Sequence, residues 1–336
     1  MVSWTAVTGL VACGGGGSAR LGDAIDGPVT ADAEVSSSAS NGPHPGTSCL
    51  GVEATCGPTG DAPCCGSPLV PGGTFFRSYD GTPDYNDRSF PATVSPFRLD
   101  RYEVSIGRFR QFVNAGMGTQ ASPPLAGAGA HATLADSGWD PAWNERLSAD
   151  TAALVSHLAC GQSGRGWTDV PGSNENLPVN CVTWLEAMAF CAWDDGYLPT
   201  EAEWNFAAAG GSEQRQYPWP NTPDGQIDCS YAEYASCPGY TGRLQRVGHD
   251  SPKGDGRWGQ SDLAGNVVEY TLDWDTEPYT NPCTDCATVI PSTPPLRMIR
   301  GGQWGENAYQ LRTSWRDVRG QETVSSDAGI RCARAP

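Results

Sequence analysis

The residues best suited to chemistry lie in one stretch near the C-terminus, RGGQWGENAYQLRTSWRDVRG at 300–320. It contains four arginines with three aromatic residues among them: Arg300, Arg312, Arg316, Arg319, Trp304, Tyr309 and Trp315. A guanidinium offers a planar fork of N–H donors that matches carboxylate, sulfate or phosphate. The stretch is therefore a candidate anion-binding groove. The alternative is that these arginines pair with internal acids such as Asp273, Asp275 and Asp317.

Cysteine usage points to an oxidising compartment. The chain has 336 residues and 13 cysteines, more than a reducing cytoplasm usually tolerates. The N-terminal segment 1–13, MVSWTAVTGLVAC, is apolar and resembles a bacterial lipobox, which predicts lipidation of Cys13 and a place in the cell envelope. Residues 1–12 lack the Lys or Arg of a signal peptide, so either the true start lies upstream or the match is fortuitous. The other twelve cysteines are compatible with six disulfides.

Composition divides the rest of the chain into three parts. Residues 14–48 have almost no large apolar side chains and predict a flexible linker. Residues 49–69 form a small Cys-rich module containing Cys49, Cys56, Cys64 and Cys65. Adjacent cysteines without paired histidines favour a disulfide knot over a zinc site. Residues 70–336 form the main domain, in which 12 tryptophans can build a core.

The formal net charge of −17 excludes nucleic acid as a partner, since phosphate binding needs a basic face. It also disfavours acidic membrane surfaces, so any membrane contact is expected only through Cys13. No other apolar run approaches the ~20 residues of a membrane-spanning helix.

Gly and Pro content predicts a loop-rich domain with few helices. Ser105 can cap a helix that ends at Gly116. Thr183 with Glu186, and Thr200 with Glu203, form capping-box patterns before two further helices. Residues 117–176 show little periodicity, so they are either a functional insertion or a region whose elements the pattern hides.

Several motifs in the main domain together resemble the formylglycine-generating enzyme family, also called sulfatase-modifying factors. They are VPGGTF at 70–75, FRLDRYEVSIGRFRQFV at 97–113, LPVNCVTWLEAMAFCAWDDGYLPTEAEWNFAAAGG at 177–211, PKGDGRWGQSDLAGNVVEYTLDW at 252–274, RMIRGGQWGE at 297–306 and AGIRC at 328–332. The resemblance implies a loop-rich α+β fold related to C-type lectins. It also implies a disulfide between Cys191 and Cys332, which would be worth on the order of 4 to 5 kcal/mol.

Active members of that family oxidise a substrate cysteine with O₂ and a copper(I) ion held by two cysteines. The corresponding positions here are Glu306 and Leu311, and residues 287–331 contain no cysteine. Copper(I) selects soft thiolate ligands, so no copper is expected. A second branch of the resemblance binds iron through histidines. Here the four histidines are scattered and read as surface or structural residues: His44, His131, His157 and His249.

The resemblance further implies a structural calcium ion in SDLAGNVVEY at 261–270. Its ligands would be Asp262 and Glu269 by side chain, with Gly265 and Val267 by backbone carbonyl. The alternative is a turn in which Asn266 satisfies backbone groups.

The remaining cysteines are assigned to local pairs. PCTDC at 282–286 could be a redox motif, but an oxidising environment favours a structural bridge between Cys283 and Cys286. Elimination then pairs Cys229 with Cys237 and Cys160 with Cys181.

The leading hypothesis is a non-catalytic, envelope-exposed lipoprotein that binds an unidentified protein, peptide or glycan. Its predicted groove is lined by Trp304, Glu306, Arg312, Trp315, Arg316 and Arg319. The alternatives are a divergent oxidoreductase with a rebuilt metal site and a purely structural envelope component.

Overall fold

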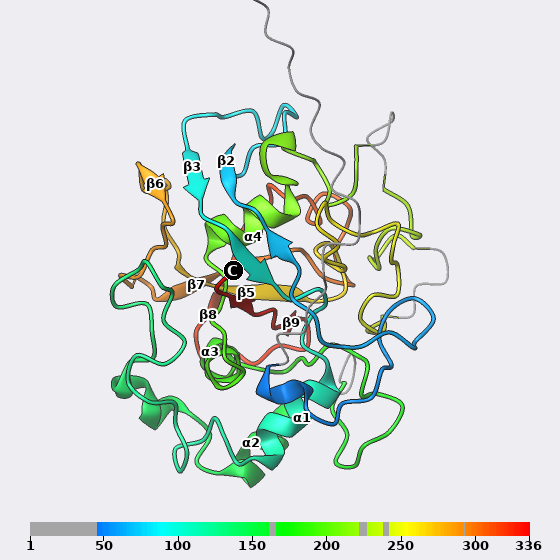
Figure 1. The fold of residues 1–336 in the computed structure, drawn as a ribbon, viewed down its shortest axis with the longest axis vertical. Coiled ribbons are helices and arrows are strands. Elements are labelled where there is room, and N and C mark those ends of the chain that lie inside the picture. The colour runs from blue at the N-terminus through cyan, green and yellow to red at the C-terminus, as the bar shows by residue number, and fades with distance from the viewer. Residues whose placement is uncertain (1–45, 161–165, 222–226, 238–241, 292) are drawn as a thin grey trace, which may run out of the picture. The chain divides into compact units, whose positions relative to one another are not determined.

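A computed structural model describes residues 46–160, 166–221, 227–237, 242–291 and 293–336, all within one unit, Asn41–Pro336 (Figure 1). Its α-helices are α1 (Ile106–Asn114), α2 (Thr151–Leu158), α3 (Trp184–Trp193) and α4 (Glu201–Ala208). Three short 3₁₀ helices accompany them: η1 (Thr47–Cys49), η2 (Pro141–Arg146) and η3 (Gly211–Glu213). The described helices are short, and none has the length and apolar character needed to cross a membrane.

The three helices predicted from their caps are confirmed. The Ser105 hydroxyl accepts the Arg108 N–H at the start of α1. Thr183 opens α3 and Thr200 opens α4, each in a complete capping box. Gly210 follows α4 at φ 66°, a left-handed conformation that glycine adopts without strain.

The segment 117–176 does contain regular structure. Asp140 caps η2 by accepting the Ala142 N–H, and Asp150 caps α2 by accepting the Ala153 N–H. Only Leu154 and Leu158 of α2 are buried. Such a short helix with two buried residues has too little hydrophobic periodicity for sequence analysis to detect.

The strands form three small sheets. The first contains β1 (Leu69–Val70), β4 (Phe97–Leu99) and β10 (Ala333–Arg334). The second contains β2 (Gly73–Phe76), β3 (Pro91–Val94) and β6 (Cys283–Thr284). The third, in the order β8-β7-β5-β9, contains β8 (Asp317–Gly320), β7 (Leu296–Arg300), β5 (Val268–Trp274) and β9 (Ala328–Gly329).

Strand β5 is the centre of the core, because all seven of its residues are buried. Helices α3 and α4 both pack against it, as Figure 1 shows. Trp184 of α3 donates its indole N–H to the carbonyl of Thr271, and Trp204 of α4 donates to the Glu269 carboxylate. Each buried tryptophan therefore also satisfies a polar group of the sheet.

All twelve cysteines among the described residues are paired in six disulfides, whereas Cys13 lies outside the described residues. The bonds join Cys191 to Cys332, Cys283 to Cys286, Cys229 to Cys237, Cys160 to Cys181, Cys49 to Cys65 and Cys56 to Cys64. The first four are the pairs expected from the sequence. The last two are a pairing that the sequence left open.

The Cys-rich segment packs against the main domain. Cys56 and Cys64 pack with Tyr102 and Val247. Residues 46–48, which the sequence placed in the linker, belong to the described structure, where η1 docks on the end of α3.

This docking rests on a buried group of charges. The Ser48 N–H donates to the Asp194 carboxylate at 2.7 Å. Asp194 and Asp100 each pair with both Arg108 and Arg334, and these side chains are nearly inaccessible. A Cβ on Gly46 would lie 2.3 Å from the Asp194 carboxylate. The small size of Gly46, which suggested a flexible linker by composition, is therefore needed here for close packing.

Candidate functional site

Three segments that are distant in the sequence line an open cavity of about 300 Å³. The first is the loop between β2 and β3, which the pairing of Phe76 with Pro91 closes at its base. The second follows β5, and the third precedes β8. The lining residues are Arg77, Ser78, Asp84, Tyr85, Asp87, Phe90, Glu277, Tyr279, Ser314, Trp315 and Arg316. Its volume suits one small ligand or one side chain of a partner.

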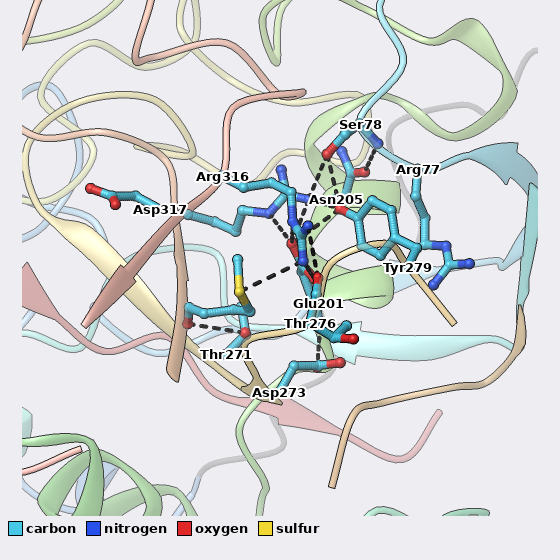
Figure 2. A network of polar contacts seen from close by, with 12 residues as sticks. Arg77, Ser78, Glu201, Asn205, Thr271, Asp273, Thr276, Tyr279, Arg316 and Asp317 are labelled. Carbon is cyan, nitrogen blue, oxygen red and sulfur yellow. Dashed lines mark hydrogen bonds and ion pairs between the residues drawn. The ribbon is translucent and has the colours of Figure 1, made fainter. Parts of the chain in front are cut away.

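Glu201, the first residue of α4, lies beneath this cavity at the centre of a buried ion-pair network (Figure 2). Arg316 donates from Nε and Nη2 to its two carboxylate oxygens at 2.7 and 3.0 Å, and Arg300 donates from Nε at 3.0 Å. Burial alone would raise the pKa of Glu201, but the charges of Arg316 and Arg300 outweigh it and lower that pKa to about 2. The carboxylate is therefore ionised throughout the physiological range.

Tyr279 connects this network to the cavity. Its hydroxyl lies 3.1 Å from Glu201 Oε1, to which it donates, and 2.9 Å from Arg300 Nη2, from which it accepts. Its ring lies between the guanidinium groups of Arg77 and Arg316, at 4.4 and 4.0 Å from the ring centre. Burial raises the pKa of Tyr279 to about 12. Both faces of the ring are thus covered by cations, and its orientation is fixed.

The two central arginines have already used their N–H donors. Arg300 Nη1 donates to the carbonyls of Thr313 and Trp315, and Arg316 Nη1 donates to Thr276 and to Glu277. An incoming anion would have to displace these partners. The geometry therefore favours pairing of these arginines with internal groups over an open anion site.

The internal acids are not the ones expected. Asp273 accepts backbone N–H groups of Glu201 and Thr288 at 2.7 and 2.8 Å, and burial followed by the charge of Glu201 raises its pKa to about 7. Asp317 points away from Glu201 in Figure 2. The partners of the arginines are instead Glu201 and Glu277, both absent from the sequence-based expectation.

The predicted groove residues separate into two groups. Trp315 and Arg316 line the cavity. Arg312 lies next to it, with Nη1 3.2 Å from the Thr82 hydroxyl and 3.7 Å from Asp84.

The other predicted groove residues do not line this cavity. Glu306 accepts from the Gln303 N–H at 3.0 Å and from the Gln310 amide at 3.1 Å, so it stabilises its own loop, which also holds Trp304. Burial raises the pKa of Glu306 to about 7. Arg319 lies on β8 and pairs with Asp327. Arg316 is only three residues away, but it pairs with Glu201, whereas the position of Arg319 on strand β8 brings it to Asp327.

Sequence reasoning missed the loop 77–90 and Glu201. The loop reads FRSYDGTPDYNDRSF from 76 to 90, a run of acids and aromatic residues directly after the VPGG motif, and that composition was an available signal. Glu201 lies in the LPTEAEW motif. The capping box in this motif already explains it as the start of a helix, so the motif did not point to a separate role for Glu201.

Two of the expected calcium ligands, Asp262 and Glu269, contact protein groups in the structure. Glu269 forms a fully buried ion pair with Arg331 at 2.6 Å, and its Oε2 also accepts from the Trp204 indole. Asp262 accepts the Gly248 N–H. Within the described ranges, no group of three His, Cys, Asp or Glu side chains could hold a metal ion. The calcium ion expected from the sequence stays a prediction.

The described histidines have ordinary carboxylate neighbours. His131 Nε2 lies 3.2 Å from Glu203, and His249 Nδ1 lies 2.8 Å from the adjacent Asp250. His157 is near Glu186 at 3.8 Å. His44 lies outside the described residues.

The sequence profile of the sulfatase-modifying factor enzyme 1-like domain matches residues 54–336. The chain belongs to this family. The formylglycine-generating enzyme of Thermomonospora curvata is 31% identical to it over 306 residues, covering 81% of this chain and 94% of that enzyme. The mouse relative named inactive C-alpha-formylglycine-generating enzyme 2 is 29% identical, over 79% of this chain and 84% of its own. The relatives therefore include proteins named as the enzyme and one named as an inactive form of it.

Solved structures agree on the fold of this sulfatase-modifying factor family member. PvdO from Pseudomonas aeruginosa superposes with a TM-score of 0.56 at 20% identity, covering 80% of this chain and 93% of PvdO. Treponema denticola variable protein 1 gives a TM-score of 0.53 at 20% identity, covering 80% and 95%. At this identity the likeness establishes the loop-rich α+β fold alone.

Proposed function

We propose that the protein is a non-catalytic member of the sulfatase-modifying factor family that binds a ligand through the cavity beside Trp315 and Arg316. The observation that supports this is the state of its thiols. Each of the twelve cysteines in the described part is held in a disulfide, and Glu306 and Leu311 stand where the family resemblance places the copper-binding cysteines. A carboxylate that binds its own loop and a fully buried leucine offer no soft ligand for copper(I).

The cavity supports the binding half of the proposal. Its walls are aromatic and polar side chains from three loops, and the network around Glu201 holds them in place. Loops on a rigid, disulfide-bonded scaffold are a common way to present a binding surface. The occupant in this proposal is a partner protein, peptide or glycan outside the cell.

We expect the purified full chain to retain no copper after anaerobic loading with Cu(I) and removal of excess metal by a Cu(I)-specific chelator. The reason is the lack of a thiolate pair. Elemental mass spectrometry on the same sample would measure copper, iron and calcium per chain. Formation of formylglycine in a cysteine-containing peptide, followed by mass spectrometry, would serve as the activity control. One tightly held copper or iron per chain would overturn the proposal in favour of a divergent oxidoreductase.

We further propose that Cys13 carries a lipid that holds the protein at the bacterial envelope. Support comes from the lipobox-like residues before it and from the oxidised state of the other cysteines. Replacing Cys13 with serine is expected to abolish labelling by a fatty-acid analogue and to release the protein from membranes. The Trp315→Phe variant, with Cys13 intact, is the control. Equal membrane retention of both variants would refute the anchor.

A further inference from the structure

We propose that the disulfide between Cys283 and Cys286 is redox-active and exchanges with two thiols of a partner polypeptide, leaving Cys286 as a thiolate beside the guanidinium of Arg77. This inference goes beyond the proposed ligand-binding function and does not depend on it. It also revises the expectation that this C-x-x-C pair is only a structural bridge. Three observations support it: a buried cation without an anion, a sulfur atom in contact with that cation, and the unequal exposure of the two cysteines.

Arg77 is a buried cation that forms no ion pair within the described residues. It is 4% exposed, and its Nη2 donates to neutral groups, the carbonyl of Thr280 at 2.7 Å and the side-chain oxygen of Asn281 at 3.0 Å. Its Nε has no hydrogen-bond partner there. Figure 2 shows its guanidinium beside the Tyr279 ring and away from the Glu201 carboxylate. A buried charge without a counterion is costly, and burial accordingly lowers the pKa of Arg77.

The remaining nitrogen of this guanidinium contacts the disulfide. Arg77 Nη1 donates to Cys286 Sγ at 3.5 Å. A sulfur atom in a disulfide is a weak, uncharged acceptor, whereas a thiolate carries a full negative charge. Reduction of the bond therefore places an anion next to a buried cation that lacks one. Because the cation stabilises the reduced form, it makes the disulfide easier to reduce.

The two sulfur atoms differ in access. Cys283 is 4% exposed and pairs with Ala92 in the ladder between β3 and β6, whereas Cys286 is only partly buried. An incoming thiolate is therefore expected to reach the bond at Cys286. The neighbouring carboxylate of Asp285 opposes a thiolate, but it already accepts the N–H and the hydroxyl of Ser95 at 2.6 and 2.7 Å. These contacts fix the turn between the two cysteines.

The exchange takes place in two displacements. One thiolate of the partner attacks Cys286 Sγ and forms a mixed disulfide, and Cys283 leaves as a thiolate that takes up a proton. The second thiolate of the partner attacks the partner's sulfur in the mixed disulfide, so that Cys286 leaves as a thiolate beside Arg77. The partner loses two electrons and becomes a disulfide, and the cysteine pair gains them. A small disulfide such as oxidised glutathione would return the pair to its oxidised form.

The first test equilibrates the full chain in glutathione buffers and measures the reduced fraction of each disulfide by acid quenching, alkylation and mass spectrometry. We expect Cys283–Cys286 to open at a value of [GSH]²/[GSSG] at least ~10-fold lower than Cys229–Cys237 does. The second bond is a matched control. It also joins a partly exposed cysteine to a buried one, but no cation contacts its sulfur atoms within the described ranges. Opening of both bonds at the same value would overturn the proposal.

Variants of Arg77 test the cause. Arg77→Gln removes the charge, so it should raise the [GSH]²/[GSSG] value that opens Cys283–Cys286 by about 10-fold and leave Cys229–Cys237 unchanged. Arg77→Lys keeps the charge and should stay closer to the wild type. An unchanged value in Arg77→Gln would contradict the role of the guanidinium.

A measurement on the wild type needs no variant. Once Cys283–Cys286 is reduced, the alkylation rate of Cys286 should rise with pH about a midpoint at least ~1 pH unit below the ordinary thiol value of about 8.5. A midpoint at or above the ordinary value would show that Arg77 does not hold a thiolate.

Single replacements identify the reacting sulfur. In Cys283→Ser the free thiol is Cys286, which should attack oxidised glutathione, form a mixed disulfide and release one reduced glutathione. In Cys286→Ser the free thiol is the buried Cys283, which should react at least ~10-fold more slowly. Equal rates would refute the assignment of Cys286. Finally, the oxidised wild type mixed with a reduced Cys-Gly-Gly-Cys peptide, blocked at both ends, should yield one peptide disulfide for each Cys283–Cys286 bond opened. A peptide that stays reduced would overturn the exchange.

Discussion

Replacing Glu201 with glutamine is expected to lower the free energy of unfolding by about 3 to 5 kcal/mol, because it removes the carboxylate from a buried pair. The positive charges of Arg300 and Arg316 would then lie close together with no buried anion between them. Side chains of Glu201 and Arg300 are at most 4% exposed, so water cannot replace the missing partner. Guanidinium denaturation at pH 7 would measure the loss. The cavity should lose ligand binding in parallel, since Arg316 and Tyr279 depend on the same carboxylate.

The control is Glu277→Gln, which removes the exposed partner of the same Arg316. An exposed ion pair contributes at most about 1 kcal/mol, so this variant should stay close to the wild type. Similar losses of unfolding free energy in the two variants would mean that Glu201 is not the main stabilising group of the ion-pair network.

The pH dependence of stability provides a second test of the role of Glu201. The pKa of Glu201 falls from an ordinary 4.5 to about 2 on folding, so the folded state binds its proton less readily than the unfolded state. Its stabilisation is therefore fully present above pH 4.5 and disappears as the pH falls towards 2, by linkage on the order of 3 kcal/mol. The difference in stability between wild type and Glu201→Gln should shrink over that interval. A constant difference would contradict the assignment.

Removing the bond between Cys191 and Cys332 is the second change with a large expected effect. The two residues are 141 positions apart, and closing so long a loop in the unfolded chain is worth about 5 kcal/mol in the chain-entropy model. Both cysteines are fully buried between α3 and the C-terminal strand. The double alanine variant is therefore expected to unfold at much lower denaturant, and it should fail to accumulate at 37 °C.

Cys283 and Cys286 supply the matched control for that experiment. Their bond spans three positions, for which the same model gives about 2 kcal/mol. Removing it by the same double replacement should therefore cost less than half as much. Equal losses would show that loop length does not govern the contribution of these disulfides.

The fold was predictable where local chemistry decides it. Ser105, Thr183 and Thr200 each cap a helix, and a cap can be recognised within four residues of sequence. The disulfide between Cys191 and Cys332 required the family resemblance, because nothing near either cysteine identifies its partner. Helix α2 was missed because its burial is too slight to leave a pattern.

The cavity was predictable only in part. The stretch 300–320 contributed Trp315 and Arg316, but their acidic partner Glu201 lies about 100 residues earlier. Side chains from β2–β3, the segment after β5 and the segment before β8 meet only in the folded chain. The sequence suggested that the N–H donors of Arg316 are available to bind an anion. In the structure these donors are hydrogen-bonded to groups of the protein itself.

The docking of η1 on Asp194 has a mechanical consequence. A tension applied to the chain before Gly46 reaches Ser48 first, and Ser48 is hydrogen-bonded to Asp194 at the end of α3. Asp194 in turn is bound to Arg334 of the C-terminal strand and to Arg108 of α1. The load is thus divided among three elements at once, and it enters the domain before the loops closed by Cys49 and Cys56. We therefore expect the domain to resist pulling at this point through several buried contacts together, rather than through one hydrogen bond.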